Sequence, residues 1–194
     1  MNAMYVMERE APYGCYTYRD FLEWDETEHC ELINGETYML TAPSLAHQDI
    51  CGALYRQLAV FLDKKPCRVF FAPVAVRLRP KKDNSDNTVL EPDIIVVCDP
   101  AKLDGRSCNG PPDLVIEILS PSTAKIDRLL KFNKYLDAAV REYWMVDGDA
   151  GTVEVCVLDK DRYVLTPYDE TETVSVGVLP GCTVDLSRVF PRPA

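Results

Sequence analysis

Nearly continuous apolar runs are the clearest pattern along the chain. Residues 93–98 and 113–119 consist mainly of Ile, Val and Leu, and a proline precedes each run. Such runs are typical of strands that are buried on both faces of a sheet. Residues 68–78, rich in Val and Phe, predict one long strand, and a polar loop is expected over residues 80–87. Further strands are expected at residues 142–146, 152–158 and 162–166.

Helical spacing marks two longer segments. The first begins at Pro43 and Ser44, ends near Leu62, and has apolar residues at Ile50, Ala53, Leu54, Leu58 and Phe61. The second is expected to begin at Ser120-Pro121-Ser122 and to run to about Ala138. Its broad apolar face comprises Ile126, Leu129, Leu130, Phe132 and Leu136.

Capping and turn signals predict two shorter elements near the N-terminus. Residues 17–20 have the form of a capping box, which predicts a short helix to about Asp25. Asn34-Gly35 separates two strand-like stretches and predicts a hairpin, because both positions tolerate positive φ. The order of all these elements is that of a mixed α/β domain in which a helix crosses over after a central strand.

Charged residues inside the apolar segments are the candidates for chemistry. Asp93 begins one predicted central strand, Glu117 lies within the next, and Lys131 lies on the following helix. A carboxylate in an apolar strand is costly unless it is paired or binds a cation. A hard divalent cation between two such carboxylates removes their repulsion, and Mg²⁺ would also polarise a phosphate and activate water. The structural alternative is a buried ion pair of Glu117 with Lys131 or Arg128, with Asp93 ending its strand.

Length and charge limit the function classes. The 194 residues favour one domain, and no apolar run approaches the roughly 20 residues of a membrane span. The first residues lack the basic and apolar segments of a secretion signal. The net charge of -10 opposes broad electrostatic binding of nucleic acid. One basic cluster could contact a phosphate backbone or be a solvated strand end and loop: Arg68, Arg77, Arg79, Lys81 and Lys82.

The eight cysteines include no CxxC pair, which argues against a zinc ribbon or a redox motif. We expect them to be reduced, with several buried as small hydrophobes, in a reducing cytoplasm.

Several motifs in a fixed order resemble a known family. They are residues 16–18, 31–36, 47–48, 92–94 and 112–123, then Asp127, Lys131 and Tyr135, and finally residues 142–147. Together they resemble the Uma-two family of restriction endonuclease-like proteins over about residues 15–186, with residues 1–14 as an N-terminal extension and one domain over residues 15–190. That family is similar to the PD-(D/E)XK nucleases. The resemblance implies a restriction-endonuclease-like α/β core with a mixed central sheet flanked by helices, Mg²⁺-dependent phosphodiester hydrolysis, and a homodimer.

The resemblance also implies roles for individual residues. Asp93 matches the aspartate of the PD half, Glu117 the second acidic residue, and Glu31 an additional N-terminal acidic position. The lysine expected two residues after Glu117 is absent, because position 119 is Leu, and Lys131 matches a lysine moved to the next helix. The carbonyl of Ile118 would be a further metal ligand.

His47 lies near the start of the first long helix, where it could serve as a hydrogen-bond donor or a general base, or simply cap or pack the helix. The leading prediction is a Mg²⁺-dependent endonuclease acting on DNA, with Mn²⁺ as a substitute ion. Two alternatives stay open: a non-catalytic binding protein that retains the fold, and a metal-dependent hydrolase of a smaller phosphodiester.

Overall fold

The computed structural model describes residues 15–24, 29–120 and 126–190. Its central feature is a six-stranded sheet in the order β10-β9-β8-β7-β5-β3. Strands β7 and β8 are parallel, and the other neighbours in this sheet are antiparallel. The helical elements are α1 (Tyr18–Phe21), α2 (Leu45–Leu62), η1 (Pro100–Lys102), η2 (Ile126–Lys131), α3 (Phe132–Asp137) and η3 (Leu186–Arg188). The strands are β1 (Cys30–Ile33), β2 (Glu36–Met39), β3 (Arg68–Phe71), β4 (Ala75–Arg77), β5 (Ile94–Val97), β6 (Ser107–Asn109), β7 (Leu114–Leu119), β8 (Glu142–Asp147), β9 (Thr152–Asp159), β10 (Arg162–Asp169), β11 (Thr173–Ser175) and β12 (Thr183–Asp185).

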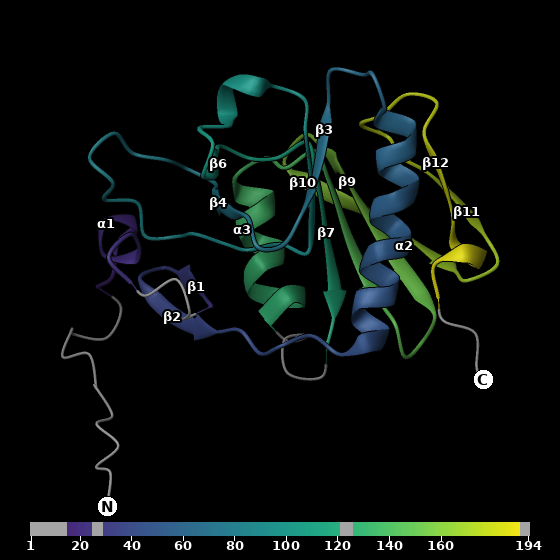
Figure 1. Cartoon of the computed structure of the whole chain (residues 1–194), viewed down its shortest axis with the longest axis horizontal. Coiled ribbons are helices and arrows are strands. Elements are labelled where there is room, and N and C mark those ends of the chain that lie inside the picture. The colour runs from purple at the N-terminus through teal and green to yellow at the C-terminus, as the bar shows by residue number, and fades with distance from the viewer. Residues whose placement is uncertain (1–14, 25–28, 121–125, 191–194) are drawn as a thin grey trace, which may run out of the picture.

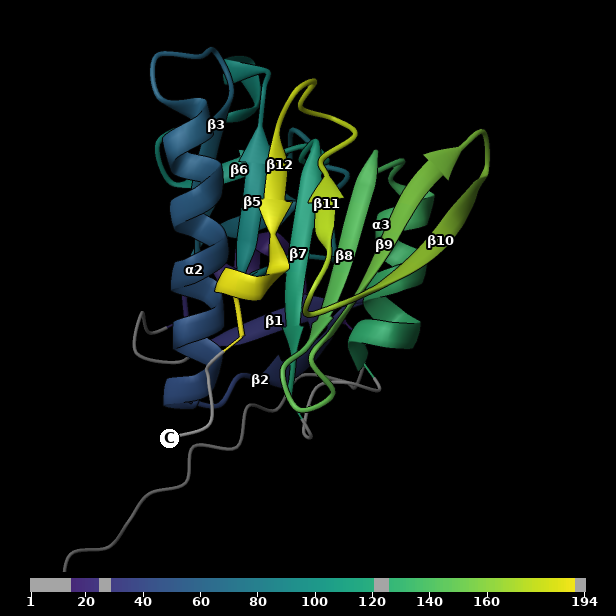
Figure 2. The same cartoon turned by 90° about the vertical axis from the view of Figure 1, so that its right-hand side faces the viewer.

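The sheet is covered on both faces, as the continuous apolar strands predict. Figures 1 and 2 show α2 and the β11–β12 pair against one face and α3 against the other. Along β7, Leu114, Ile116 and Ile118 pack toward α2, whereas Val115 packs toward α3. The fold is therefore the expected mixed α/β fold, and neighbouring positions on one strand belong to different sides of the sheet.

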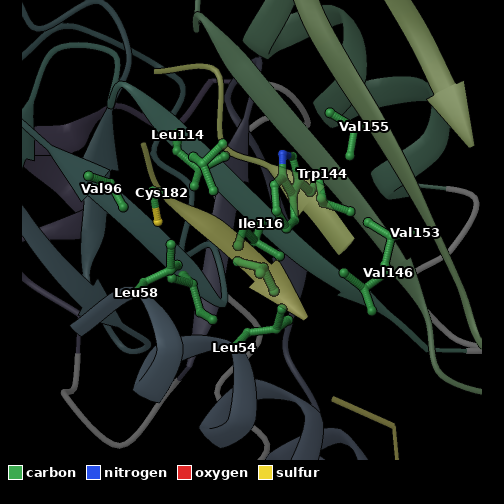
Figure 3. Close-up of a cluster of buried hydrophobic side chains, with 14 of the residues drawn as sticks. Leu54, Leu58, Val96, Leu114, Ile116, Trp144, Val146, Val153, Val155 and Cys182 are labelled. Carbon is green, nitrogen blue, oxygen red and sulfur yellow. The ribbon is translucent and has the colours of Figure 1, made fainter. Parts of the chain in front are cut away.

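The core on the α2 side is the larger of the two. Leu54 and Leu58 of α2 meet Val96, Ile116 and other sheet residues, which Figure 3 shows in one cluster. The Trp144 side chain lies in this cluster, fully buried. Ser44 caps the start of α2, and the first turn lies beside the end of the sheet that carries the acidic residues, with His47 Nε2 3.3 Å from Asp93 Oδ2.

One predicted element is wrong. Residues 68–78 form two strands, β3 and β4, instead of one. The Ala72–Pro73 peptide bond between them is cis, and β4 leaves the central sheet to pair in parallel with β6. Proline has no N–H for a sheet ladder, so the strand ends there.

The helix expected over residues 120–138 is also different in detail. Its proposed cap at Pro121 and Ser122 lies outside the described residues, and the described part begins with six residues of π-helix, η2, before α3. Short π-helical segments are rare and occur frequently at functional sites.

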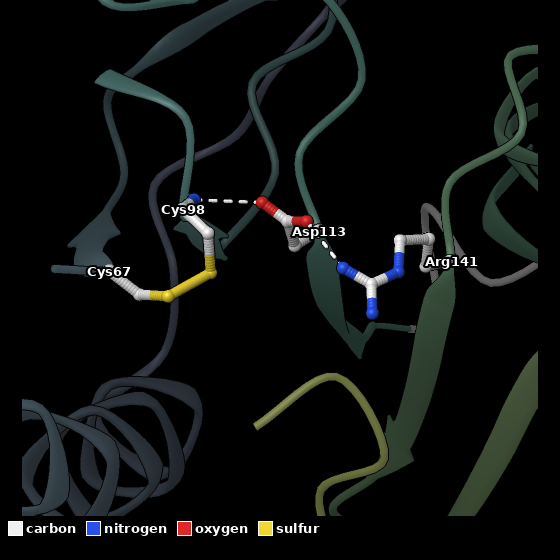
Figure 4. The surroundings of a disulfide bond; sticks show 4 residues. All are labelled: Cys67, Cys98, Asp113 and Arg141. Atoms are coloured by element: carbon white, nitrogen blue, oxygen red, sulfur yellow. Dashed lines mark hydrogen bonds and ion pairs between the residues drawn. A yellow bond between two sulfur atoms is a disulfide. The ribbon is translucent and has the colours of Figure 1, made fainter. Parts of the chain in front are cut away.

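The expectation of reduced thiols is wrong for two cysteines. Cys67 and Cys98 form a disulfide between the ends of β3 and β5. Arg68 pairs with Val97 in the antiparallel β3–β5 ladder. Extending this register by one residue places Cys67 opposite Cys98. As Figure 4 shows, the backbone N–H of Cys98 donates to Asp113, which also accepts from Arg141. Cysteines 108, 156 and 182 are buried as expected.

Candidate active site

A cleft of about 610 Å³ lies at the end of the sheet where β5 begins and β7 ends. Its walls include the start of α2, the segment after β2 and the residues that follow β8. Four of the five predicted site side chains line it, namely Asp93, Glu117, Lys131 and His47, together with Ile118. Glu31 is buried and contacts the Lys131 ammonium. The fold thus brings together residues that are up to 100 positions apart in the sequence.

The sheet register explains why the two central carboxylates meet. β5 and β7 are antiparallel, with Ile94 opposite Ile116. One further step along this register places Asp93 opposite Glu117, and residues opposite each other in adjacent strands have neighbouring side chains. The prediction of two carboxylates on neighbouring strands agrees with this arrangement.

Lys131 lies at the centre of a buried acidic cluster. Its Nζ is 2.9 Å from Glu31 Oε1 and 3.1 Å from both Glu117 Oε1 and Asp127 Oδ1. Only 4% of Lys131 is exposed, so the ammonium interacts with these carboxylates with little screening by water. The hydroxyl of Tyr135 donates to Glu117 Oε1 over 2.7 Å. The described hydrogen bonds to the Glu117 carboxylate therefore all end on one of its two oxygens.

Asp93 is held in a similar way. Its Oδ2 accepts a hydrogen bond from the backbone N–H of Ile118 at 2.7 Å and lies 3.3 Å from His47 Nε2. His47 is in the first turn of α2, where its backbone N–H donates to the Ser44 side chain. The helix cap and the side chain of His47 thus fix the edge of the cleft next to Asp93.

The charges of the cluster perturb one another strongly. Burial raises the pKa of Glu117 well above its usual value, Lys131 opposes this rise, and the carboxylates of Asp127, Asp93 and Glu31 add to it. Burial would lower the pKa of Lys131, but Glu117, Glu31 and Asp127 hold that pKa well above its usual value. Lys131 is therefore charged at neutral pH, and one ammonium faces an excess of carboxylates.

The residues present fit a divalent cation. Within the described ranges, no three His, Cys, Asp or Glu side chains form a preformed metal centre. Mg²⁺, however, commonly uses only one or two carboxylates and completes its coordination with water and substrate oxygens. Asp127 Oδ1 is buried beside the cluster and accepts no hydrogen bond from the described residues. This oxygen lies 3.1 Å from the Lys131 ammonium, and burial together with neighbouring carboxylates raises the pKa of Glu117, so a divalent cation would be stabilised by both groups.

Three residues that were not predicted as site residues complete the cluster. Tyr135 lies four residues after Lys131, a spacing that puts both on one helix face. Asp127 precedes Lys131 by the same interval, and its Oδ1 lies 3.1 Å from Lys131 Nζ as an i,i+4 pair. The Glu91 side chain lines the cleft, and its backbone N–H donates to Glu31 over 2.8 Å. Glu91 directly precedes Pro92 and Asp93 in the sequence, and this position is the signal that could have identified it as a site residue.

The basic cluster expected from the sequence is not one surface. Arg77 is buried and forms a two-pronged ion pair with Asp86, at 2.5 and 2.8 Å. Arg68 lies over the ring of Phe70. Arg79 and Lys81 remain exposed beyond β4.

The sheet, the helices on its two faces and the paired acidic residues at adjacent strands define an α/β protein with a restriction-endonuclease-like fold. No helix within the described parts of the chain is both long and apolar enough to span a membrane.

The chain belongs to the Uma2 family, described as "Putative restriction endonuclease", whose model matches residues 18–187. It is similar to an uncharacterized protein of Synechocystis sp., with 26% identity over 175 residues that span 87% of this chain and 90% of that relative. Its structure is similar to the crystal structure of a putative nuclease belonging to DUF820 from Anabaena variabilis, with a TM-score of 0.73 and 19% identity. That match covers 90% of this chain and 97% of the other, and it shows a shared fold.

Proposed function

We propose that the protein is a Mg²⁺-dependent endonuclease that hydrolyses phosphodiester bonds of DNA. The observation that carries the proposal is the meeting of Asp93, Glu117 and Lys131 in one open cleft. Membership of the Uma2 family supports the same reaction class.

Asp93 and Glu117 would hold the metal, with the Ile118 carbonyl as a further ligand. Each carboxylate has one oxygen engaged by protein donors, Oδ2 of Asp93 and Oε1 of Glu117. The other oxygen of each is the one we assign to the metal. A bound Mg²⁺ would supply charge to polarise the phosphate and to acidify an attacking water.

The remaining residues would orient these groups. Lys131 has three N–H donors, of which Glu31 and Glu117 engage two. Asp127 Oδ1 lies 3.1 Å from the same Nζ without a hydrogen bond, so the third donor would turn from Asp127 to contact the attacking water or a phosphate oxygen. Its charge would offset the negative charge that develops on the phosphate in the transition state. Glu31 keeps the ammonium in place, and we assign His47 the role of hydrogen-bond donor to Asp93.

We further propose that one domain over residues 15–190 acts as a homodimer in the cytoplasm. Two copies of one active site related by a two-fold axis can cut both strands of a duplex. Sedimentation should give about twice the 21.9 kDa chain mass, and a constant monomer mass at all concentrations would contradict the dimer.

The cleavage assay uses supercoiled plasmid DNA with Mg²⁺ or Mn²⁺. The wild type should nick the plasmid, and EDTA should stop the reaction. Asp93→Asn should lower the rate at least about 100-fold, because a neutral amide is a poor ligand for a hard cation. Asp161→Asn, at an exposed position in the β9–β10 turn, is the matched control and should cleave like the wild type. Equal cleavage by Asp93→Asn and wild type would refute the assigned site.

A further inference from the structure

The described walls of the active-site cleft are predominantly acidic. The described lining contains one lysine, Lys131, whose charge is already surrounded by carboxylates. The acidic side chains that line the cleft are Glu91, Asp93, Glu117, Asp127 and Asp149. With a net charge of -10 on the whole chain, a cationic anchor elsewhere on the surface would help to hold an anionic strand.

A second, smaller hollow of about 210 Å³ has the opposite character. It lies between the loop after β4 and the outer side of α3, and three cations line it: Arg79, Lys81 and Lys134. Each cation donates a hydrogen bond to a neutral oxygen. Arg79 donates to the backbone carbonyl of Asp137, and Lys81 donates to the backbone carbonyl of Ser85. Lys134 donates to the side-chain oxygen of Asn34.

The positive charge of this hollow is only partly offset by its neighbours, because the Asp83 carboxylate interacts with Lys81 and Asp137 lies in the lining. None of the three cations forms an ion pair with a described carboxylate. Asp86 also lines the hollow, but the buried guanidinium of Arg77 engages both of its oxygens. Asp137 supplies the remaining carboxylate of the lining. Arg has five N–H donors and Lys has three, so each cation keeps donors for a ligand.

The hollow is close to the catalytic cluster along the chain and in space. Lys134 follows Lys131 by three residues, so the two lie about one helical turn apart on one continuous helical segment. Lys131 contacts Glu31 in β1, whereas Lys134 contacts Asn34 in the turn that ends the same strand. A strand leaving the cleft along this hairpin would therefore reach the hollow.

We propose that Arg79, Lys81 and Lys134 bind a backbone phosphate of the nucleic acid substrate, outside the cleft in which it is cut. The inference rests on the proposed function for the identity of the ligand. The guanidinium of Arg79 suits the oxygens of a phosphate, and the two ammonium groups add point charges on either side. The anchor would hold the strand without reading its sequence, because phosphate contacts carry no base information.

The test measures binding of a fluorescein-labelled 20-bp DNA duplex by anisotropy, in EDTA and over a range of salt concentrations. The variant combines three substitutions in one protein: Arg79→Gln, Lys81→Gln and Lys134→Gln. The matched control is Arg56→Gln, Arg162→Gln, Arg188→Gln, which removes the same charge at three exposed positions elsewhere. Loss of one phosphate contact should lower the slope of log K against log salt by about 0.9, so we expect a decrease of about 0.9 for the variant and none for the control. Affinity at low salt should fall at least about tenfold.

The outcomes separate this proposal from the proposed function, because binding is measured without a metal or cleavage. Equal weakening in variant and control would overturn it, since only overall charge would then matter, and so would unchanged binding in the variant. A further experiment measures the thermal midpoint with inorganic phosphate alone. If phosphate raises the midpoint of the wild type but not of the variant, while both proteins bind DNA equally, the hollow is a site for free phosphate. That result would refute the proposal. If DNA binds through the hollow but no nicking occurs with Mg²⁺ or Mn²⁺, the anchor stands and the proposed function fails.

Discussion

Replacing Lys131 by Met removes its ammonium from the buried acidic cluster while keeping most of the side-chain volume. Three carboxylate oxygens lie within 3.1 Å of Nζ, and they belong to Glu31, Glu117 and Asp127. Removing one partner of a buried ion pair typically costs about 3–5 kcal/mol, because the other charge stays buried without compensation. We therefore expect the free energy of unfolding of Lys131→Met to fall by about 3–5 kcal/mol near neutral pH. Nuclease activity should be abolished as well.

The pH dependence of this loss follows from the direction of the pKa shifts. Burial raises the pKa of Glu117 and of Glu31 above the usual 4.5, and Lys131 opposes both rises. Without Lys131 the two carboxyls would bind protons at still higher pH in the folded state. A carboxyl with a raised folded pKa destabilises the fold as pH rises from its unfolded value through its folded one. The stability deficit of the variant should therefore be smaller at pH 5 than at pH 8.

Urea unfolding of both proteins at these two pH values measures the deficit directly. Lys134→Met, one helical turn further on and partly exposed, is the control and should cost less than about 1 kcal/mol. A deficit for Lys131→Met that is below about 1 kcal/mol, or equal at the two pH values, would refute the argument for an essential buried ammonium.

Two further substitutions test neighbouring parts of the structure. Tyr135→Phe removes the hydroxyl that donates to Glu117 and should lower the free energy of unfolding by about 1.5–3 kcal/mol, with slower cleavage; unchanged stability and rate would show that this hydrogen bond is unimportant. Arg77→Met breaks the buried pair with Asp86 and should cost about 3–5 kcal/mol at pH 7 by urea unfolding. Burial raises the pKa of Asp86, but hydrogen bonds from Arg77 and from the backbone lower this pKa overall. The ion pair with Arg77 therefore stabilises the fold at pH values above the usual pKa of 3.8. This stabilisation is lost as the pH falls through the pKa of Asp86 in the folded state. A cost that stays constant down to pH 3 would contradict that assignment.

Local chemistry was enough to predict several elements correctly. The turn at Asn34-Gly35 has positive φ at both residues, 57° and 86°, as the hairpin signal requires. Ser44 caps α2, and its side chain accepts a hydrogen bond from the third residue of that helix. The acidic residues Asp93 and Glu117 stood out because their strands are otherwise apolar, and the sheet places them on adjacent strands. These features depend on a few neighbouring residues, and the sequence shows such residues directly.

Features that depend on distant contacts were not predictable in this way. The contact of Lys131 with Glu31 joins residues 100 positions apart and requires the β1 hairpin to pack beside α3. The disulfide of Cys67 with Cys98 depends on the register of β3 against β5. The break in the predicted long strand depends on the conformation of Pro73 and on the pairing of β4 with β6, neither of which is visible in local hydropathy.

Titration calorimetry with Mn²⁺ tests the central claim most directly, because that claim is a divalent-cation site formed by Asp93 and Glu117. The wild type should bind Mn²⁺ with a dissociation constant at or below the millimolar range, and Asp93→Asn and Glu117→Gln should each abolish or strongly weaken the binding. Bound metal should also raise the thermal midpoint of the wild type by mass action. Absence of Mn²⁺ binding to the wild type at millimolar concentration, or equal binding by all three proteins, would contradict the account.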